Sequence, residues 1–125
     1  QLDGKTIGIL GLAFKPGTDD IREAPSVKIV RDLLKAGAKV RAYDPAAMES
    51  ARRLLTDVQY CDDEYDAARG SDALVVVTEW NQFRRLDMDC LKQVMREPNI
   101  IDLRNLYEPD TMRSAGFNYL AMGRN

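Results

Sequence analysis

The chain has 125 residues, of which 45% are hydrophobic and 30% are charged. Its 18 basic and 20 acidic residues give a formal net charge of −2, which offers no long-range attraction to DNA or to an anionic membrane. No apolar run approaches the roughly 20 residues of a membrane-spanning helix, and no secretory signal pattern is present. These features predict one globular domain of the cytoplasm that binds neither nucleic acid nor membrane.

The chemistry available to the chain is limited by its lack of histidine. The commonest general base and the commonest zinc ligand are therefore missing. The two cysteines, Cys61 and Cys90, are far apart and follow no metal-type spacing, and in an intracellular chain we expect them to stay reduced. We predict no metal site and little catalytic machinery in this chain.

Strand-like and helix-like periods alternate along the sequence. The apolar run 6–12 predicts a strand buried on both faces. The helical spacing of Val27, Val30, Leu33 and Leu34 predicts a helix that begins at Pro25 and is ended by Gly37. Further strands are expected at 39–43, 58–60, 73–77, 99–103 and 118–122, and further helices at 46–55, 64–69, 87–95 and 109–114.

This alternation predicts an α/β fold, because right-handed crossovers between parallel strands place helices on both faces of the sheet. We expect a three-layer, doubly wound, Rossmann-like sheet of about six parallel strands. The switch point of such a sheet is expected between 6–12 and 73–77, and ligands bind beyond the carboxyl ends of the strands near that point. The polar residues that follow strands at this edge are Lys15, Arg22, Asp44, 78–81, Arg104 and Asn105.

Gly8 and Gly11 form a G-x-x-G pattern, which lacks the third glycine of the dinucleotide-binding fingerprint. We interpret the two glycines as positions of tight strand-to-loop packing, with phosphate binding as the alternative.

Three other residues after strands have two interpretations each. Asp44 precedes Pro45, so it can accept from a ribose or cap the helix at 46–55, and we prefer capping. Trp80 and Phe83 can stack on a base, but aromatic residues beyond a central strand more often close the core.

The cations Lys15, Arg22 and Arg104 are candidates for binding a diphosphate, because phosphate oxygens favour charge-assisted hydrogen bonds. The alternative for the first two is that they are solvated loop cations paired with acidic neighbours. Those acidic neighbours can also complement the dipole of the helix that follows, and they are Asp19, Asp20 and Glu23.

Four segments together resemble the C-terminal domain of the UDP-glucose/GDP-mannose dehydrogenases. They are LGLAFKPGTDDIREAPS at 10–26, YDP at 43–45, VTEWNQFR at 77–84 and IIDLRNLY at 100–107. The resemblance extends over nearly the whole chain and implies a single UDP-sugar-binding domain over 1–125, the C-terminal part of a longer dehydrogenase. The start at Gln1 instead of Met agrees with this expectation. The members that it resembles most oxidise UDP-glucose to UDP-glucuronate and reduce two NAD.

The resemblance also implies roles for particular residues. Phe14 and Lys15 would contact the UDP-glucose, Arg104 would hold it from the opposite loop, and Arg22 would reach across an interdomain cleft toward NAD. In the family, NAD is bound mainly by an N-terminal dinucleotide-binding domain, and the nucleophilic cysteine also lies outside the segments matched here. We therefore assign no catalytic residue to this chain, expect it to be inactive alone, and expect the full enzyme to be a homo-oligomer.

Two other functions stay open. One is a freestanding Rossmann-like nucleotide sensor, which the lack of histidine and of a placed nucleophile would suit. The other is the same domain from a dehydrogenase of another nucleotide-sugar. A phosphoacceptor signalling domain, which the Asp19-Asp20 pair could suggest, is rejected, because such a domain needs an aspartate ending the third strand and a lysine ending the fifth. Here Arg104 follows the fifth strand, and the acidic pair lies well beyond the first strand.

Overall fold

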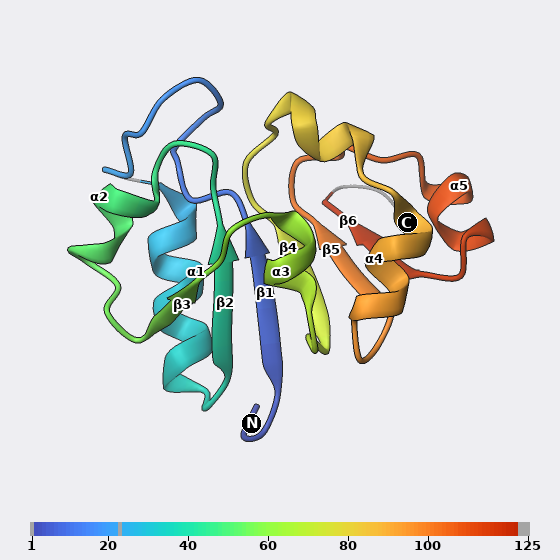
Figure 1. Ribbon diagram of the computed structural model, residues 1–125, viewed down its shortest axis with the longest axis horizontal. Helices are drawn as coiled ribbons and strands as arrows, with labels where there is room; N and C mark the ends of the chain where they lie inside the picture. Colours follow the sequence, from blue (N-terminus) through green and yellow to red (C-terminus); the bar gives the residue numbers. More distant parts are fainter. Residues whose placement is uncertain (1, 23, 123–125) are drawn as a thin grey trace.

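The computed structural model describes residues 2–22 and 24–122. In these stretches six strands form one sheet in the order β3-β2-β1-β4-β5-β6 (Figure 1). The strands are β1 Thr6–Leu10, β2 Lys39–Tyr43, β3 Val58–Tyr60, β4 Ala73–Val76, β5 Asn99–Asp102 and β6 Asn118–Ala121. The helices are α1 Pro25–Lys35, α2 Met48–Arg52, α3 Glu64–Ala68, α4 Met88–Val94 and α5 Pro109–Ser114, with a 3-10 helix η1 at Asn81–Arg85.

All neighbouring strands of the sheet run parallel. β1 lies between β2 and β4, so the winding reverses between β1 and β4, with Ile7 beside Ala73 and Leu10 beside Val76. The predicted fold class and switch point are therefore confirmed. Several elements are shorter than predicted, most clearly α2, because the residues that precede it form a turn instead of a helix.

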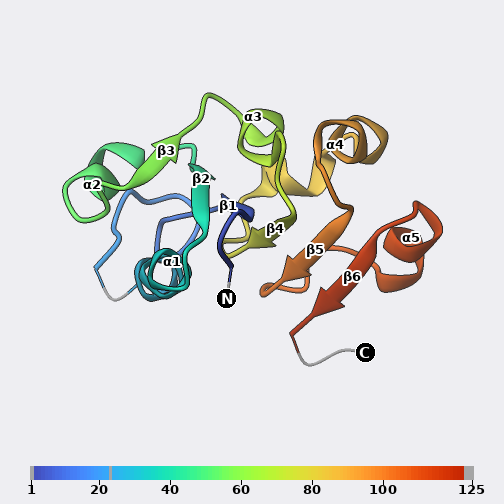
Figure 2. The same ribbon diagram turned by 90° about the horizontal axis from the view of Figure 1, so that it is seen from below.

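The sheet separates two apolar cores, and α1 lies on the opposite face of the sheet from α3 and α4 (Figure 2). One core joins the sheet to α1 and α2 and includes Ile9, Val30 and Leu55. The other joins the sheet to α3, α4 and α5 and includes Phe83, and further members are Leu10, Leu74, Leu91, Ile100 and Met112. Burial of the large side chains of both cores supplies the main favourable term for folding.

Helix α1 has the start and the end that the sequence predicts. Pro25 occupies the first turn, where its missing N–H costs nothing, and Val30 is fully buried. Gly37 has a φ of +98°, and its N–H donates to the carbonyl of Leu34, while the N–H of Ala38 donates to Leu33. This is the left-handed glycine ending expected after the helix.

The amino-terminal edge of the sheet is closed by Asp72. Its carboxylate accepts from the Arg96 guanidinium at 2.8 Å through both oxygens and from the N–H of Thr6 at 2.9 Å. The Arg96 hydrogen bonds lower the pKa of Asp72 from 3.8 to about 2. The edge opposite the predicted site is therefore fixed by a charged pair.

Candidate functional site

The carboxyl edge of the sheet brings together three loops that are far apart in the sequence. The loop after β1 carries Phe14 and Lys15, the loop after β4 carries Glu79, and the loop after β5 carries Arg104. Because β4 lies between β1 and β5, the loops of Lys15 and Arg104 flank the switch-point strand. The predicted substrate-binding residues thus share one edge, as the sequence indicates.

Asp44 is completely buried and organises the first of these loops. Its Oδ2 accepts from the backbone N–H groups of Leu12 at 2.7 Å and Ala13 at 3.0 Å, and from Trp80 Nε1 at 3.1 Å. Its Oδ1 accepts from two further N–H groups at 2.8 Å, those of Ala46 and Ala47. Asp44 therefore holds the turn that leads into α2, but it does not cap the helix as predicted, because α2 begins at Met48 and its N-cap residue Ala47 has no side-chain cap hydrogen bond. Five donors surround the Asp44 carboxylate, which was also considered as an acceptor from a ribose.

Asp102 plays the same part for the loop that carries Arg104. One of its oxygens accepts from the N–H of Arg104 at 3.0 Å. The other accepts from the N–H of Leu106 at 2.7 Å, the N–H of Tyr107 at 3.1 Å and the hydroxyl of Tyr119 at 2.6 Å. This buried carboxylate was not among the residues predicted from the sequence. Its position in the sequence could have indicated this role, because Asp102 ends the apolar strand β5 in the same way that Asp44 directly follows β2.

Gly8 and Gly11 allow close backbone approach. A Cβ on Gly8 would lie 2.7 Å from the carbonyl oxygen of Ala67 in α3. Gly11 has a φ of +99°, and a Cβ there would lie 2.6 Å from the backbone N of Thr78. The packing interpretation is confirmed, and α1 begins only at Pro25, so no helix N-terminus follows the glycines directly.

Phe14 and Lys15 emerge where this fixed loop reaches the surface. The preceding residues Leu12 and Ala13 are buried, whereas the Phe14 side chain is 52% exposed. The N–H of Phe14 donates to the carbonyl of Asp20 at 2.7 Å, which folds the loop back on itself. Lys15 is exposed and has no hydrogen-bond or ion-pair partner among residues 2–22 and 24–122.

Arg104 is held by Glu79 across the switch point. Its Nη2 donates to Glu79 Oε2 at 2.9 Å, and its Nε lies 2.8 Å from Oε1 as an ion-pair contact without hydrogen-bond alignment. The hydrogen bond from Arg104 is the main cause that lowers the pKa of Glu79. The pair fixes one edge of the guanidinium, a contact that the sequence analysis did not foresee.

Arg22 pairs within its own loop. Its Nε and Nη2 each donate to the Asp20 carboxylate at 3.1 Å, and its side chain remains 88% exposed. This supports the alternative of a solvated cation for Arg22, although Glu23 lies outside the described residues. In the part of the chain that the structure describes, no contact joins Arg22 to Lys15 or Arg104, and no acidic residue occupies the first turn of α1.

The aromatic residues after β4 differ in burial. Phe83 is completely buried in the core under α4 and α5, which confirms the core interpretation. Trp80 is half-buried, touches both cores and is fixed by its bond to Asp44.

One extended groove lies away from the switch point. It has a volume of about 870 Å³, follows the outer side of α1 and is lined mainly by apolar side chains, with Leu54 and Arg22 at its margins. We place the candidate site at the sheet edge instead, because cations on two loops flank β4 there, at the switch point of the sheet.

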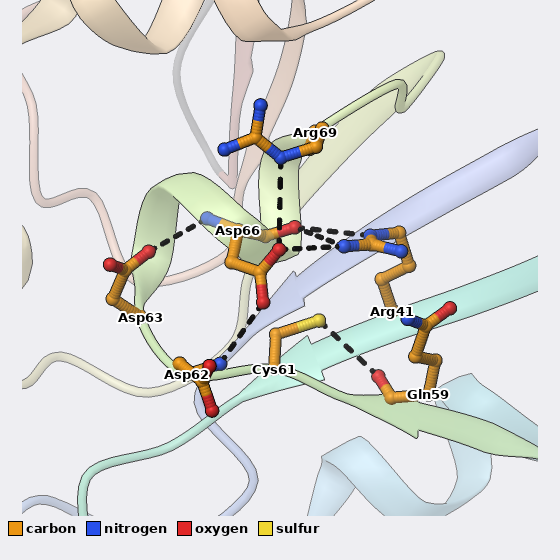
Figure 3. A network of polar contacts seen from close by, with 7 residues as sticks. All are labelled: Arg41, Gln59, Cys61, Asp62, Asp63, Asp66 and Arg69. Carbon is orange, nitrogen blue, oxygen red and sulfur yellow. Dashed lines mark hydrogen bonds and ion pairs between the residues drawn. The ribbon is translucent and has the colours of Figure 1, made fainter.

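Cys61 belongs to a polar network beneath α3 (Figure 3). Asp66 is its centre: Arg41 donates to both the carbonyl and the carboxylate of Asp66, and Arg69 lies within 3.7 Å of the same carboxylate. The Cys61 thiol is buried and donates to the Gln59 carbonyl, and burial raises its pKa. A buried, protonated thiol is a poor nucleophile, and Cys61 and Cys90 are both free.

Residues 2–22 and 24–122 lack two other kinds of site. They contain no group of three or more histidine, cysteine or acidic residues that could hold a metal ion. None of the helices in this part of the chain has the length and apolar character needed to cross a membrane.

Comparison with known proteins identifies the family. The family described as UDP-glucose/GDP-mannose dehydrogenase, UDP binding domain, matches residues 8–109. A UDP-glucose 6-dehydrogenase of Rhizobium meliloti (strain 1021) is 49% identical over 124 residues, which cover 99% of this chain and 28% of that protein. The UDP-glucose 6-dehydrogenase of Pseudomonas aeruginosa is 46% identical over 127 residues, covering 97% of this chain and 28% of that protein.

Solved structures agree with this result. The NDP-N-acetyl-D-galactosaminuronic acid dehydrogenase from Methanosarcina mazei Go1 has a TM-score of 0.83 and 36% identity, over 99% of this chain and 26% of that one. A UDP-glucose dehydrogenase from Pyrobaculum islandicum has a TM-score of 0.76 and 37% identity, over 95% of this chain and 25% of that one. The chain spans 28% of the length of the curated relatives named above. It belongs to the UDP-glucose/GDP-mannose dehydrogenase family, of which it is the UDP binding domain.

Proposed function

We propose that the chain binds the UDP part of UDP-glucose at the carboxyl edge of its sheet, between the loops after β1 and β5. We further propose that it does so within an NAD-dependent dehydrogenase that converts UDP-glucose to UDP-glucuronate. The observation that carries the proposal is the arrangement of Lys15 and Arg104 on either side of β4, on loops fixed by buried aspartates. Nucleotide ligands of doubly wound sheets bind at this place.

The two cations have complementary roles in the proposal. Lys15, which lacks a partner among the described residues, supplies an ammonium group to the diphosphate. Arg104 presents the guanidinium edge that Glu79 leaves open, so that its orientation is set before the ligand arrives. Phe14 adds an exposed aromatic surface beside Lys15 for apolar contact with the ligand.

Fixed loops matter for affinity because each side chain or loop that must be ordered on binding reduces the net free energy of association. The backbone on both sides of the site is already held by hydrogen bonds to Asp44 and Asp102. Only the ends of Phe14 and Lys15 remain to be ordered. The domain therefore has the features of a preorganised anion site.

NAD does not fit the β1 turn of this domain in the manner of a dinucleotide fingerprint. Backbone atoms already fill the space beside Gly8 and Gly11, and the carboxylate of Asp44 is surrounded by donors. We propose that the hydride-accepting NAD is bound mainly by a part of the protein outside these residues, and that Arg22 contributes one exposed cation toward it. We assign no step of the oxidation to this chain.

The remaining proposals concern the whole protein. Two free cysteines suit a reducing compartment, so we place the protein in the cytoplasm. We also propose that it works as a homo-oligomer, as expected from the family resemblance.

The test is isothermal titration of the protein in its natural length with UDP and with UDP-glucose. Arg104→Gln and Lys15→Gln should each weaken binding by about tenfold or more, since a desolvated charged hydrogen bond contributes about 1.5–3 kcal/mol. Lys39→Gln is the matched control, because Lys39 begins β2 and lies at the opposite edge of the sheet. Unchanged affinity in both site variants would overturn the proposed site. UDP binding without any dehydrogenase activity would support the nucleotide sensor instead.

A further inference from the structure

The sheet is covered unequally on its two faces. Helices α4 and α5 cover the face of β4, β5 and β6 that carries the second core, and α3 continues this layer over β1 and β2 (Figure 2). On the other face α1 lies along β1 and β2, and no helix in the described part of the chain underlies β5 and β6. Parallel sheets are normally buried on both faces by helices. The uncovered half of this sheet is therefore unusual.

The side chains on this uncovered side are apolar and aligned. Alternate residues of a strand point to opposite faces, and Val75, Ile101 and Leu120 alternate with members of the second core. The strand register places Val75 beside Ile101 and Ile101 beside Leu120. Their exposure increases away from α1: Val75 is buried, Ile101 is half-buried and Leu120 is 58% exposed.

A second apolar row follows at the carboxyl end of the same strands. The N–H of Leu103 donates to the Val76 carbonyl, and the N–H of Met122 donates to the Asp102 carbonyl, so the strand pairing continues by one residue. Leu103 is half-buried, and the Met122 side chain is 58% exposed. We call the surface made by Ile101, Leu103, Leu120 and Met122 the open face, and Val75, a buried member of the first core, lies at its inner edge.

The open face has a polar margin and a shallow hollow. Asn118 donates to Asn99 at 2.9 Å across the amino ends of β5 and β6, which bounds the apolar rows on that side. A hollow of about 450 Å³ over β4, β5 and β6 includes Ile101 and Leu120 in its lining. Scattered exposed apolar residues need no explanation, but a contiguous apolar patch with a polar rim marks an interaction surface.

The dimensions of the open face match an α-helix. Neighbouring strands lie about 4.8 Å apart, so β6 lies about 10 Å from β4, where the first core ends at Val75, and this span is close to the diameter of a helix with its side chains. The two apolar rows are two residues apart along the strands, about 6.6 Å, which is near the pitch of one helical turn. One amphipathic helix lying along β5 would contact both rows.

We infer that the open face binds an amphipathic helix of the same polypeptide, from the part of its length beyond these 125 residues. The curated relatives are much longer than this chain, which spans only 28% of them, so a polypeptide of the relatives' length has ample sequence to supply such a helix. The helix would extend the layer of α1 over β5 and β6, so that both faces of the sheet are covered. This inference concerns the face of the sheet and is independent of the nucleotide site at its edge.

The test is hydroxyl-radical footprinting of the protein in its natural length. The labelling rate of each side chain is compared between the folded and the urea-unfolded state. Leu120 and Met122 should be protected several-fold on folding, far more than their 58% exposure in this chain implies. Leu54 follows α2 in the sequence, is 48% exposed and is the matched control leucine. Its protection from labelling should be no greater than this exposure implies. The labelling is repeated over a dilution series in which the oligomeric state is measured.

Each outcome decides the inference. Protection of Leu120 that persists on dilution to monomer supports a helix of the same polypeptide. Protection that is lost when the protein dissociates assigns the open face to a second copy and overturns the inference, as does an unprotected Leu120. In a second measurement, Leu120→Gln should lower Tm by several degrees more than Leu54→Gln. UDP binding should be unaffected in both variants, so the nucleotide proposal can stand if this one fails.

Discussion

Replacing Asp44 with asparagine should weaken the fold severely while hardly changing the shape of the side chain. The buried carboxylate accepts three hydrogen bonds at Oδ2 and two at Oδ1. An amide has one accepting oxygen and one donating NH₂ group, so in either orientation at least two N–H donors face another donor. A hydrogen bond to a charged group contributes about 1.5–3 kcal/mol, so Asp44→Asn should cost about 3–6 kcal/mol of the free energy of unfolding.

Urea unfolding followed by circular dichroism measures this loss. Asp32→Asn is the matched control: Asp32 pairs with Lys28 at 2.8 Å on the surface of α1, its side chain is 59% exposed, and the urea midpoint should change little. A loss for Asp44→Asn below about 1 kcal/mol, the contribution of one ordinary hydrogen bond, would refute the view that Asp44 organises the edge.

Three further predictions follow from single contacts. The pKa of Asp72 is about 2 in the folded chain, against 3.8 for an unperturbed aspartate. The free energy of unfolding that its ionised carboxylate contributes is therefore present above about pH 4 and is lost as the pH falls toward 2. Asp72→Asn should therefore lower the free energy of unfolding in urea by about 2 kcal/mol at pH 7 and much less near pH 2; equal losses at both would contradict this. Gly11→Ala should cost at least about 2–4 kcal/mol through strain and overlap, whereas Gly17→Ala, with open space around it, should lower Tm less. Glu79→Gln should weaken UDP binding several-fold in titration calorimetry by releasing Arg104; tighter binding would show that Glu79 only competes with the phosphate.

The order of the elements was predictable because each strand and helix has a clear apolar period. Val75 and Ile9 lie in continuous apolar runs, and Gly37 ends α1 where the sequence predicts. The ends of elements were less predictable, because side chains from elsewhere in the sequence decide them. The turn before α2 is held by Asp44, and β1 stops before Gly11, whose positive φ leaves the extended conformation.

The edge that carries the site was predictable, but the contacts within it were not. The position of Lys15 and Arg104 after strands of a doubly wound sheet follows from topology alone. The pairing of Arg104 with Glu79 joins residues 25 positions apart and depends on how two loops meet. The role of Asp102 depends likewise on Tyr119, which reaches it from the neighbouring strand β6. Sequence periodicity contains no information about such contacts.

At the carboxyl edge two acidic side chains are buried and the cations lie at the surface, an arrangement that suits an anionic ligand. Asp44 and Asp102 are both completely buried, where an unpaired carboxylate would be costly. Backbone N–H groups, Trp80 and Tyr119 satisfy them, so neither needs a basic side chain as its partner. The cations that reach this edge are therefore not used to neutralise buried charge. Lys15 has no acidic partner among the described residues, and Glu79 engages only one edge of Arg104. A chain with a net charge of −2 can thus present two cations at one edge of its sheet without any overall attraction for anions.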